Sequence, residues 1–384
     1  MNSKKSLIFF YPSLEIGGLT KNLFSLINSL VKKNYPVTFV TFENTKDNRV
    51  KNKLYSFNKK INILTPKIKI KTEIRLIKYF FCFFVLLKYL SNKNDLLVSF
   101  QSNVLAILAA KLTKSKIIIR CNTAPSKYIS NNFKRLFFKL IYSFSNKILV
   151  TSNDFKNEMK KYFNLNSLVH RQSLDLKGIQ FKSKKKIKFE FFDKYQHLKI
   201  IYVGRLTHQK DISTLLNSFL NLLKFRKARL LLVGSGTEES KIKLFIKNNN
   251  LEKSIKIINF QSNPYPFILK SDIKILSSRF EGNPNILLEV ACLKKLIISS
   301  DCKVGPSEIL QRGKGGILYK VGDSKSLYKI LKNVDLKDKI IKKKIDITYK
   351  YVKDNFKKDI SNTFIDILKK LEMKIAIIGS GFFG

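Results

Sequence analysis

The sequence predicts an α/β protein built from two doubly wound parallel sheets. Short apolar runs, typical of buried strands, alternate along the chain with longer segments of helical periodicity. This alternation favours parallel sheets with helices on both faces, because each parallel connection needs a long crossover. A chain of 384 residues is too long for one ordinary core and fits two domains of roughly 170 to 190 residues.

The N-terminal half begins with a predicted strand and a glycine-containing loop. Gly17 and Gly18 end this loop, and a helix opens near Thr20. Two glycines let a ligand approach the backbone closely, and a helix start offers N–H groups to an anion, although a plain turn is the alternative. The strands expected in this half are 6–11, 37–42, 61–64, 95–100, 116–120 and 147–151.

The C-terminal half repeats the alternation after a lysine-rich segment, 174–196, that lacks clear periodicity and is interpreted as a linker. We expect domains at 1–185 and 186–352, a C-terminal helix at 353–372 and an appended segment at 373–384. The strands expected in this half are 199–203, 229–233, 255–259, 272–276, 296–300 and 316–319.

The chain is strongly basic, with a net charge of +47 from 74 Lys and Arg against 27 Asp and Glu. Such a balance favours polyanionic partners, namely nucleic acid, an anionic membrane surface or phosphorylated substrates. The alternative is compositional, because Lys, Asn, Ile and Phe are abundant together. No recognised nucleic-acid module is present, and the lysines are spread along the whole chain, so nucleic acid is not expected as a partner.

Two basic and aromatic stretches are candidates for peripheral contact with an anionic membrane. Residues 71–90 and 133–144 place phenylalanines among cations, and ordinary core helices with charged rims are the alternative. The most apolar run, 79–87, is shorter than the about 20 residues that span a bilayer. The candidate cations are Arg75, Lys78, Lys88, Lys134, Arg135 and Lys139.

The four cysteines form no C-x-x-C pair, and the N-terminus is interpreted as a first strand and not as a signal peptide. Reduced thiols and a cytoplasmic location at the inner face of the cell membrane are therefore expected.

Residues 277–290 combine a strand end, a loop and a helix start. Glu281 lies in the loop, Asn283 is the expected N-cap and Pro284 the expected first helical residue. Glu289 is the only charge in the apolar run that follows, so a buried carboxylate there needs partners. The hydroxyls of a bound ribose would satisfy it, and a salt-bridged or rim-exposed Glu is the alternative.

A second segment, 204–211, follows the first strand of the C-terminal half. Arg205 and Lys210 place cations beyond the carboxyl end of that strand, where they suit a diphosphate. The later loop 234–236 resembles a dinucleotide loop, but Glu238 and Glu239 in the next helical turn would repel a phosphate. That loop is therefore expected to be structural.

Residues 277–290 resemble the E-x7-E signature of the retaining GT-B glycosyltransferases of family 4. Further blocks match in the family's order at 202–206, 263–266, 300–310 and 315–318. The resemblance implies two Rossmann-like domains facing a cleft. It also implies retaining transfer, by a hexosyltransferase-type enzyme, from a nucleotide diphosphate sugar, a UDP-sugar, to a lipid-linked or growing saccharide in surface polysaccharide, O-antigen or capsule biosynthesis.

The resemblance implies a role for each matched residue. Glu281 would contact the donor sugar, Arg205 and Lys210 the diphosphate, and Glu289 the ribose. No cofactor and no metal are implied, and Asp-x-Asp is absent. The remaining donor-site residues would be Gly204, Asn283, Pro284, Asn285, Gly17 and Gly18.

One departure from the family leaves two alternatives open. Many relatives carry a His after a strand where this chain has Arg120-Cys121-Asn122-Thr123. A catalytically inactive GT-B relative is therefore one alternative, and a basic nucleic-acid-binding protein without catalysis is the other.

The last residues, 373–384, combine an expected strand with G-x-G-x-x-G and resemble the start of a flavoprotein such as UDP-galactopyranose mutase. The helix and ribose-binding acid of a dinucleotide site do not follow, so this segment is expected to bind no dinucleotide alone.

Overall fold

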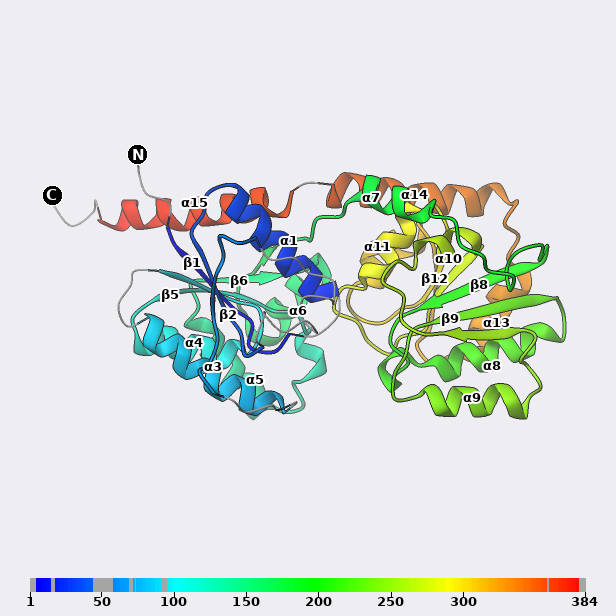
Figure 1. Cartoon of the computed structure of the whole chain (residues 1–384), viewed down its shortest axis with the longest axis horizontal. Coiled ribbons are helices and arrows are strands. Elements are labelled where there is room, and N and C mark those ends of the chain that lie inside the picture. The colour runs from blue at the N-terminus through cyan, green and yellow to red at the C-terminus, as the bar shows by residue number, and fades with distance from the viewer. Residues whose placement is uncertain are drawn as a thin grey trace. The chain divides into compact units, whose positions relative to one another are not determined.

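The protein, described here from a computed structural model, forms two compact units. The structure describes residues 5–14, 18–43, 58–68, 72, 74–90, 95–357 and 359–379, with side chains described as far as Leu371. The first unit comprises residues 1–173 and 358–384, and the second comprises residues 174–357 (Figure 1). Each unit contains one parallel sheet with helices on both faces, which confirms the predicted α/β fold class.

The first unit is a seven-stranded parallel sheet with the order β3-β2-β1-β4-β5-β6-β7. Every strand predicted in this half is present, and the short β7 is additional. The strands are β1 (Leu7–Phe10), β2 (Val37–Val40), β3 (Asn62–Leu64), β4 (Leu96–Ser99), β5 (Lys116–Arg120), β6 (Lys147–Val150) and β7 (Leu168–Val169). The helices are α1 (Gly18–Lys32), α3 (Arg75–Leu90), α4 (Asn103–Leu112), η1 (Pro125–Lys127), α5 (Asn132–Ser143), α6 (Asn153–Phe163) and α15 (Ile360–Gly379).

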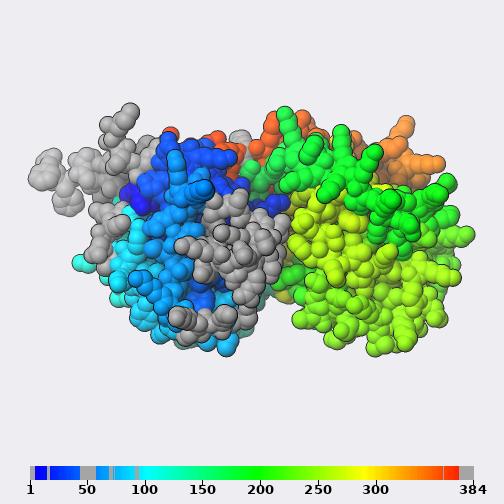
Figure 2. Space-filling model, in the orientation of Figure 1, coloured from blue at the N-terminus to red at the C-terminus, as the bar shows by residue number. Residues whose placement is uncertain are grey.

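Helix α15 returns the chain to the first unit, where it packs beside α1 (Figure 1). Its apolar face, which includes Ile360 and Phe364, is buried in the same core cluster as β1 and α1. The first unit therefore ends at Ser173 and resumes near residue 358, so the expected boundaries at 185 and 353 are wrong. In the space-filling view, blue-to-cyan chain and the red of α15 belong to one unit, and green-to-orange chain to the other (Figure 2).

Residues 373–379 continue α15 and do not form the expected strand. A strand needs a neighbouring strand for its backbone hydrogen bonds, whereas a helix satisfies its own N–H and C=O groups. This apolar segment can therefore form a helix without a neighbouring strand.

The second unit is a six-stranded parallel sheet with the order β10-β9-β8-β11-β12-β13. Its strands are β8 (Leu198–Val203), β9 (Ala228–Val233), β10 (Ile255–Ile258), β11 (Ile273–Leu276), β12 (Leu296–Ser300) and β13 (Ile317–Tyr319). Its helices are α7 (Leu176–Ser183), η2 (His208–Lys210), α8 (Ile212–Leu223), α9 (Glu239–Asn248), α10 (Tyr265–Lys270), α11 (Asn285–Cys292), α12 (Pro306–Ile309), η3 (Gln311–Gly313), α13 (Ser324–Asn333) and α14 (Lys339–Phe356).

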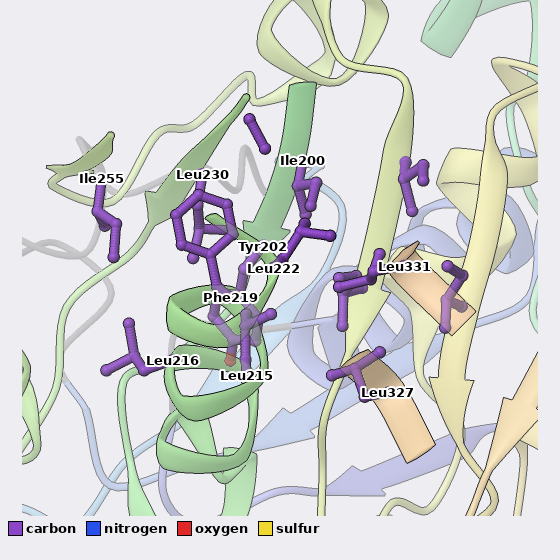
Figure 3. Packing of buried hydrophobic residues seen from close by; sticks show 14 of the residues in the cluster. Ile200, Tyr202, Leu215, Leu216, Phe219, Leu222, Leu230, Ile255, Leu327 and Leu331 are labelled. Carbon is purple, nitrogen blue, oxygen red and sulfur yellow. The ribbon is translucent and has the colours of Figure 1, made fainter. Parts of the chain in front are cut away.

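Two apolar clusters cover the two faces of this sheet. On one face Ile200 and Leu230 pack against Phe219 of α8 and Leu327 of α13 (Figure 3). On the other face lie helices α7, α10, α11 and α14. Because both faces are covered, the strands are apolar almost throughout.

The segment expected to be a linker, 174–196, belongs to the second unit. It contains α7 and buries Ile179, Phe189 and Phe192 in the core on the α11 face of the sheet. Burial of these side chains outweighs the local lysine content, so the segment folds with the second unit.

Among the described residues, no helix combines the length and apolarity needed to cross a membrane.

Candidate functional site

The candidate site lies at the carboxyl edge of the second sheet, where the loops after β8 and β11 meet. Lys210 ends η2, and Glu281 lies in the loop between β11 and α11. The Lys210 Nζ lies 2.5 Å from the Glu281 Oε1, and the two side chains are only 14% and 8% exposed. The Ser278 hydroxyl donates to the same carboxylate oxygen over 2.6 Å. The expected cation and the expected acid are thus direct partners.

Hydrogen bonds to backbone carbonyls, two from side chains and one from the backbone, hold these two loops together independently of the ion pair. The Ser277 hydroxyl donates to the Lys210 carbonyl over 2.7 Å, and the Arg279 N–H donates to the Gln209 carbonyl over 2.9 Å. The Gln209 amide donates to the Phe280 carbonyl, also over 2.9 Å. The two loops that carry Lys210 and Glu281 are therefore held together by contacts that do not depend on the ion pair.

Asp211 is a site residue that sequence reasoning missed. Its side chain is 2% exposed, accepts the Thr214 hydroxyl over 2.9 Å and lies 3.3 Å from the Arg279 guanidinium. Its backbone has a φ of 47°, which lets the chain turn sharply from Lys210 into α8. An acid directly before a predicted helix start was the available signal.

Arg205 lies earlier in the same loop after β8, with an exposed side chain 3.4 Å from the Gln209 side-chain oxygen. The loop itself is rigidly held. The Leu206 N–H donates to the Ser235 carbonyl, and the Tyr202 hydroxyl donates to the Arg205 carbonyl, both over 2.9 Å. A Cβ added at Gly234, whose φ is +145°, would lie 2.0 Å from the Gly204 carbonyl oxygen. The loop 234–236 packs on the Arg205 loop, as the structural interpretation predicted.

Helix α11 begins one residue later than expected. Pro284 occupies the N-cap position with a ψ of 88°, and Asn285 is the first helical residue. The expected N-cap, Asn283, makes no capping bond because the non-helical Pro284 separates it from the first turn. The Asn283 side-chain nitrogen is buried without a hydrogen-bond partner, as is the Thr207 hydroxyl on the Arg205 loop. Buried polar atoms of this kind are suited to a ligand's oxygens.

Gly305 is a further contact of this segment. A Cβ at Gly305 would lie 2.6 Å from the Pro284 side chain, and its φ is +101°. The loop after β12 therefore rests directly on the start of α11.

Glu289 lies on α11, half-buried, and interacts with the hydroxyl of Tyr265 at the start of α10. The pKa of Tyr265 is raised well above its ordinary value, mainly by burial and secondly by the carboxylate of Glu289. Tyr265 stands in the block 263–266 but had no expected role. The Glu289 carboxylate thus has a protein partner on a neighbouring helix.

Lys274 is a second residue that sequence reasoning missed. It lies in β11 with no exposed surface, donates from Nζ to the Ile275 carbonyl over 2.5 Å and lies 4.6 Å from the centre of the Tyr202 ring. Burial, with Lys210 as the second cause, holds the pKa of Lys274 well below its ordinary value, whereas Glu281 acts in the opposite direction. The site thus contains a second amine, that of Lys274, in addition to the amine of Lys210.

The remaining expected residues lie elsewhere. Gly17 is outside the described residues, and Gly18 begins α1 of the first unit. Arg120, where the resemblance implies a nearby His, is buried at the end of β5 and donates to the His170 Nδ1 over 3.0 Å. The His170 Nε2 in turn donates to the Ile360 carbonyl over 3.1 Å. Burial, followed by Arg120, lowers the pKa of His170 to about 3, so this ring is a neutral structural acceptor.

Within the described part of the chain, no group of three or more His, Cys, Asp or Glu side chains is placed to hold a metal ion. The four cysteines are free and buried.

The geometry agrees with a match to a known family. Residues 183–350 match the family Glycosyl transferases group 1. This match contains Arg205, Lys210, Glu281 and Glu289, and therefore the whole site described in the second unit.

Named relatives match the chain to different extents. The N-acetylgalactosamine-N,N'-diacetylbacillosaminyl-diphospho-undecaprenol 4-alpha-N-acetylgalactosaminyltransferase of Campylobacter jejuni is 27% identical over 251 residues, 63% of this chain and 67% of that protein. The amylovoran biosynthesis glycosyltransferase AmsD of Erwinia amylovora is 26% identical over 320 residues, covering 79% of this chain and 83% of its own length. The lipopolysaccharide 1,6-galactosyltransferase of Escherichia coli is 32% identical over 129 residues, 32% of this chain and 35% of its own.

Solved structures share the fold. Anabaena Alr3699/HepE in complex with UDP and glucose has a TM-score of 0.75 at 13% identity and covers 95% of this chain and 100% of its own. Sucrose-phosphate synthase of Thermosynechococcus elongatus has a TM-score of 0.77 at 13% identity, covering 97% and 100%. Two parallel-sheet α/β domains, as in these GT-B neighbours, are thus the architecture of the chain.

Proposed function

We propose that the protein is a retaining glycosyltransferase that moves a sugar, a hexose or hexose derivative, from a nucleotide diphosphate sugar to an acceptor hydroxyl. The observation that carries this proposal is the Lys210–Glu281 pair, held by two loops at the carboxyl edge of the second sheet beside the start of α11. The family match over residues 183–350 supports it, because that family transfers sugars.

The chemistry requires stabilisation of a departing diphosphate. Arg205 is exposed and able to grip two phosphate oxygens, and Lys210 supplies a point charge. The first N–H groups of α11, at Asn285 and beyond, add a partial positive charge where the helix begins. Preorganised donors of this kind act most strongly on charge that develops in the transition state.

The two acids bind different parts of the nucleotide sugar. Glu281 accepts hydrogen bonds from sugar hydroxyls while Lys210 shifts towards the diphosphate, and Ser278 keeps the carboxylate in place. Glu289, oriented by Tyr265, accepts the ribose hydroxyls. The surrounding backbone is shaped by Gly204, Asn283 and Pro284. The unpartnered side-chain nitrogen of Asn283 donates a hydrogen bond to the nucleotide sugar.

We propose a UDP-sugar as donor and a lipid-linked or growing saccharide of a surface polysaccharide as acceptor. Two solved neighbours are complexes with UDP, and one named relative acts on a diphospho-undecaprenol substrate. Such acceptors lie at a membrane, so the proposal includes work at the cytoplasmic face of the cell membrane.

The test is a panel of nucleotide sugars incubated with the protein and a membrane extract, with release of nucleoside diphosphate as the readout. We expect release with UDP-sugars, a thermal shift with UDP, and retention of the anomeric configuration by NMR. Lys243→Ala on α9, an exposed lysine of the same unit, is the control variant. The absence of any shift with UDP, GDP or ADP would contradict the proposal, and UDP binding without turnover would indicate an inactive relative.

A further inference from the structure

Helices α3, α4 and α5 lie side by side on one face of the first sheet, opposite α1 and α15 (Figure 1). These helices carry large apolar side chains that remain exposed among the described residues. We call this surface the three-helix face. Its exposed apolar residues are Leu76, Phe80 and Phe84 of α3, Leu108 and Leu112 of α4, Phe133, Leu136, Phe137 and Leu140 of α5, and Phe144 just after α5.

Helix α5 contributes most of this surface. Phe133 is 78% exposed and Leu136 65% exposed, and Tyr142 is the one residue of this helix that is buried. The exposed side chains recur three and four residues apart, which places them in one stripe along the helix. A contiguous apolar stripe turned to solvent marks an interaction surface.

Helix α3 adds a second stripe, with Leu76, Phe80 and Phe84 four residues apart. The rings of Phe80 and Phe84 contact each other edge to face, with centroids 4.9 Å apart. Lys78, which we expected to bind lipid head groups, is buried instead and pairs with Glu43 over 2.9 Å. That expectation is therefore wrong for Lys78, because a neutralised buried charge is not available to a surface.

Within the described helices α3, α4 and α5, the charged side chains are all basic. Lys111 lies with its Nζ 4.3 Å from the centre of the Phe144 ring, and Lys114, Lys134 and Lys139 are exposed near the same stripe. Helices α3, α4 and α5 contain no Asp or Glu. A second copy of this face would bring like charges together, whereas an anionic surface with an apolar interior complements both features.

We propose that the three-helix face docks the protein on an anionic lipid bilayer. The phenylalanines and leucines of α5 enter the boundary between head groups and acyl chains, and the lysines contact lipid phosphates. The purpose of this docking rests on the proposed function, because a lipid-linked acceptor lies in such a bilayer. The docking itself follows from the exposed side chains.

The experiment measures co-sedimentation of the full chain with vesicles of phosphatidylcholine, with and without phosphatidylglycerol. One variant combines Phe133→Ser, Leu136→Ser and Leu140→Ser, and another combines Lys111→Gln, Lys134→Gln and Lys139→Gln. The matched control combines Leu244→Ser, Lys247→Gln and Lys253→Gln, which are exposed residues of the second unit. All substituted side chains on α5 are exposed, so the variants should fold, as circular dichroism will check.

We expect binding to the anionic vesicles, reversal by salt, and a fall of about tenfold or more in the partition coefficient for each face variant, with no change for the control. Equal binding of the face variants and the control, or equal binding to neutral and anionic vesicles, would overturn the proposal. The proposal would also be overturned if the wild type were a dimer that binds no vesicles and that the α5 substitutions dissociate. A second copy of the chain would then cover the three-helix face.

The same variants separate this inference from the proposed function. Thermal shift by UDP, measured without vesicles, reports on the second unit alone. Loss of vesicle binding with a retained UDP shift is the expected result for the face variants. Vesicle binding by a wild-type protein that no nucleotide stabilises would refute the proposed function and leave the docking intact.

Discussion

Lys210 and Glu281 are 71 residues apart in sequence, yet their Nζ and Oε1 atoms lie 2.5 Å apart in the second unit. Adjacent parallel strands β8 and β11 bring them together, because the loops that follow neighbouring strands emerge at the same edge of the sheet. The pair is mostly shielded from water, so each charge depends on the other.

Removal of both cations should abolish most turnover. Arg205→Ala with Lys210→Ala leaves a developing diphosphate charge without its two side-chain donors, and one such donor is typically worth about 3 to 4 kcal/mol. Turnover with the preferred donor sugar is the measurement, and Lys243→Ala with Lys253→Ala is the control pair. Near-normal turnover in the double variant would place the diphosphate elsewhere.

Breaking the pair should also change stability. Lys210→Met leaves a nearly buried carboxylate with only Ser278 as donor, so we expect a loss of about 3 to 5 kcal/mol in the free energy of unfolding. Adding Glu281→Gln should restore much of it without restoring turnover. A double-mutant cycle of urea unfolding measures this, and strictly additive losses would show that the two side chains do not interact.

The two acids should differ in kinetic effect. Glu289→Ala should raise KM for the donor and weaken UDP binding, because the ribose contact is lost, whereas Glu281→Ala should mainly lower kcat. Steady-state kinetics with calorimetric UDP titration separates the two effects, and Glu252→Ala, on the exposed loop before β10, is the control. Unchanged UDP affinity in Glu289→Ala would remove the ribose assignment.

Most strands were predictable because they are apolar runs covered on both faces, as β8 and β11 are. Two long-range features were not. Helix α15 joins the first unit through Phe364, and α7 joins the second through Ile179, although neither destination is encoded locally. Lys274 illustrates the same limit, because nothing in its neighbouring residues shows that the packed sheet buries this lysine completely.

The sequence placed Arg205 and Lys210 after a strand end, and Glu281 and Glu289 before and within a helix, and the structure has them there. Their roles in binding a donor came from the resemblance and stay predictions. The contacts of Asp211 and Tyr265 were not predictable, because they depend on the packing of neighbouring loops and helices.

Lys274→Met should stabilise the second unit at neutral pH. Replacing a buried charge by an apolar side chain of similar volume is often favourable by about 1 to 4 kcal/mol. Because the folded-state pKa of Lys274 is lowered, the unfolded state binds more protons below the ordinary lysine pKa, and the native state gains stability as pH rises. The advantage of the variant should therefore shrink as pH approaches about 10. Urea unfolding across this range measures it, with exposed Lys253→Met as control, and a pH-independent difference would contradict the argument.

His170 should make the first unit acid-sensitive. The His170 ring accepts a hydrogen bond from Arg120 and donates one to the Ile360 carbonyl. Protonation of the ring would place a second cation against the buried Arg120 guanidinium. It would also remove the nitrogen that accepts the hydrogen bond of Arg120. Because the pKa of His170 is lowered to about 3 in the folded state, against about 6.5 when unfolded, the unfolded state binds the extra proton between these values. Stability should therefore fall as pH drops through this window, by up to about 1.4 kcal/mol per pH unit.

The matched variant for this histidine is His170→Gln, whose amide can accept from Arg120 and donate to the Ile360 carbonyl without titrating. We expect its melting temperature to lie near that of the wild type at pH 7 and to fall less between pH 6 and about pH 4. Calorimetric scans of the transition of the first unit measure this, and His197→Gln, at an exposed position, controls for the loss of any histidine. Parallel pH profiles for His170→Gln and the wild type would show that the Arg120–His170–Ile360 contacts do not set the acid stability of the unit.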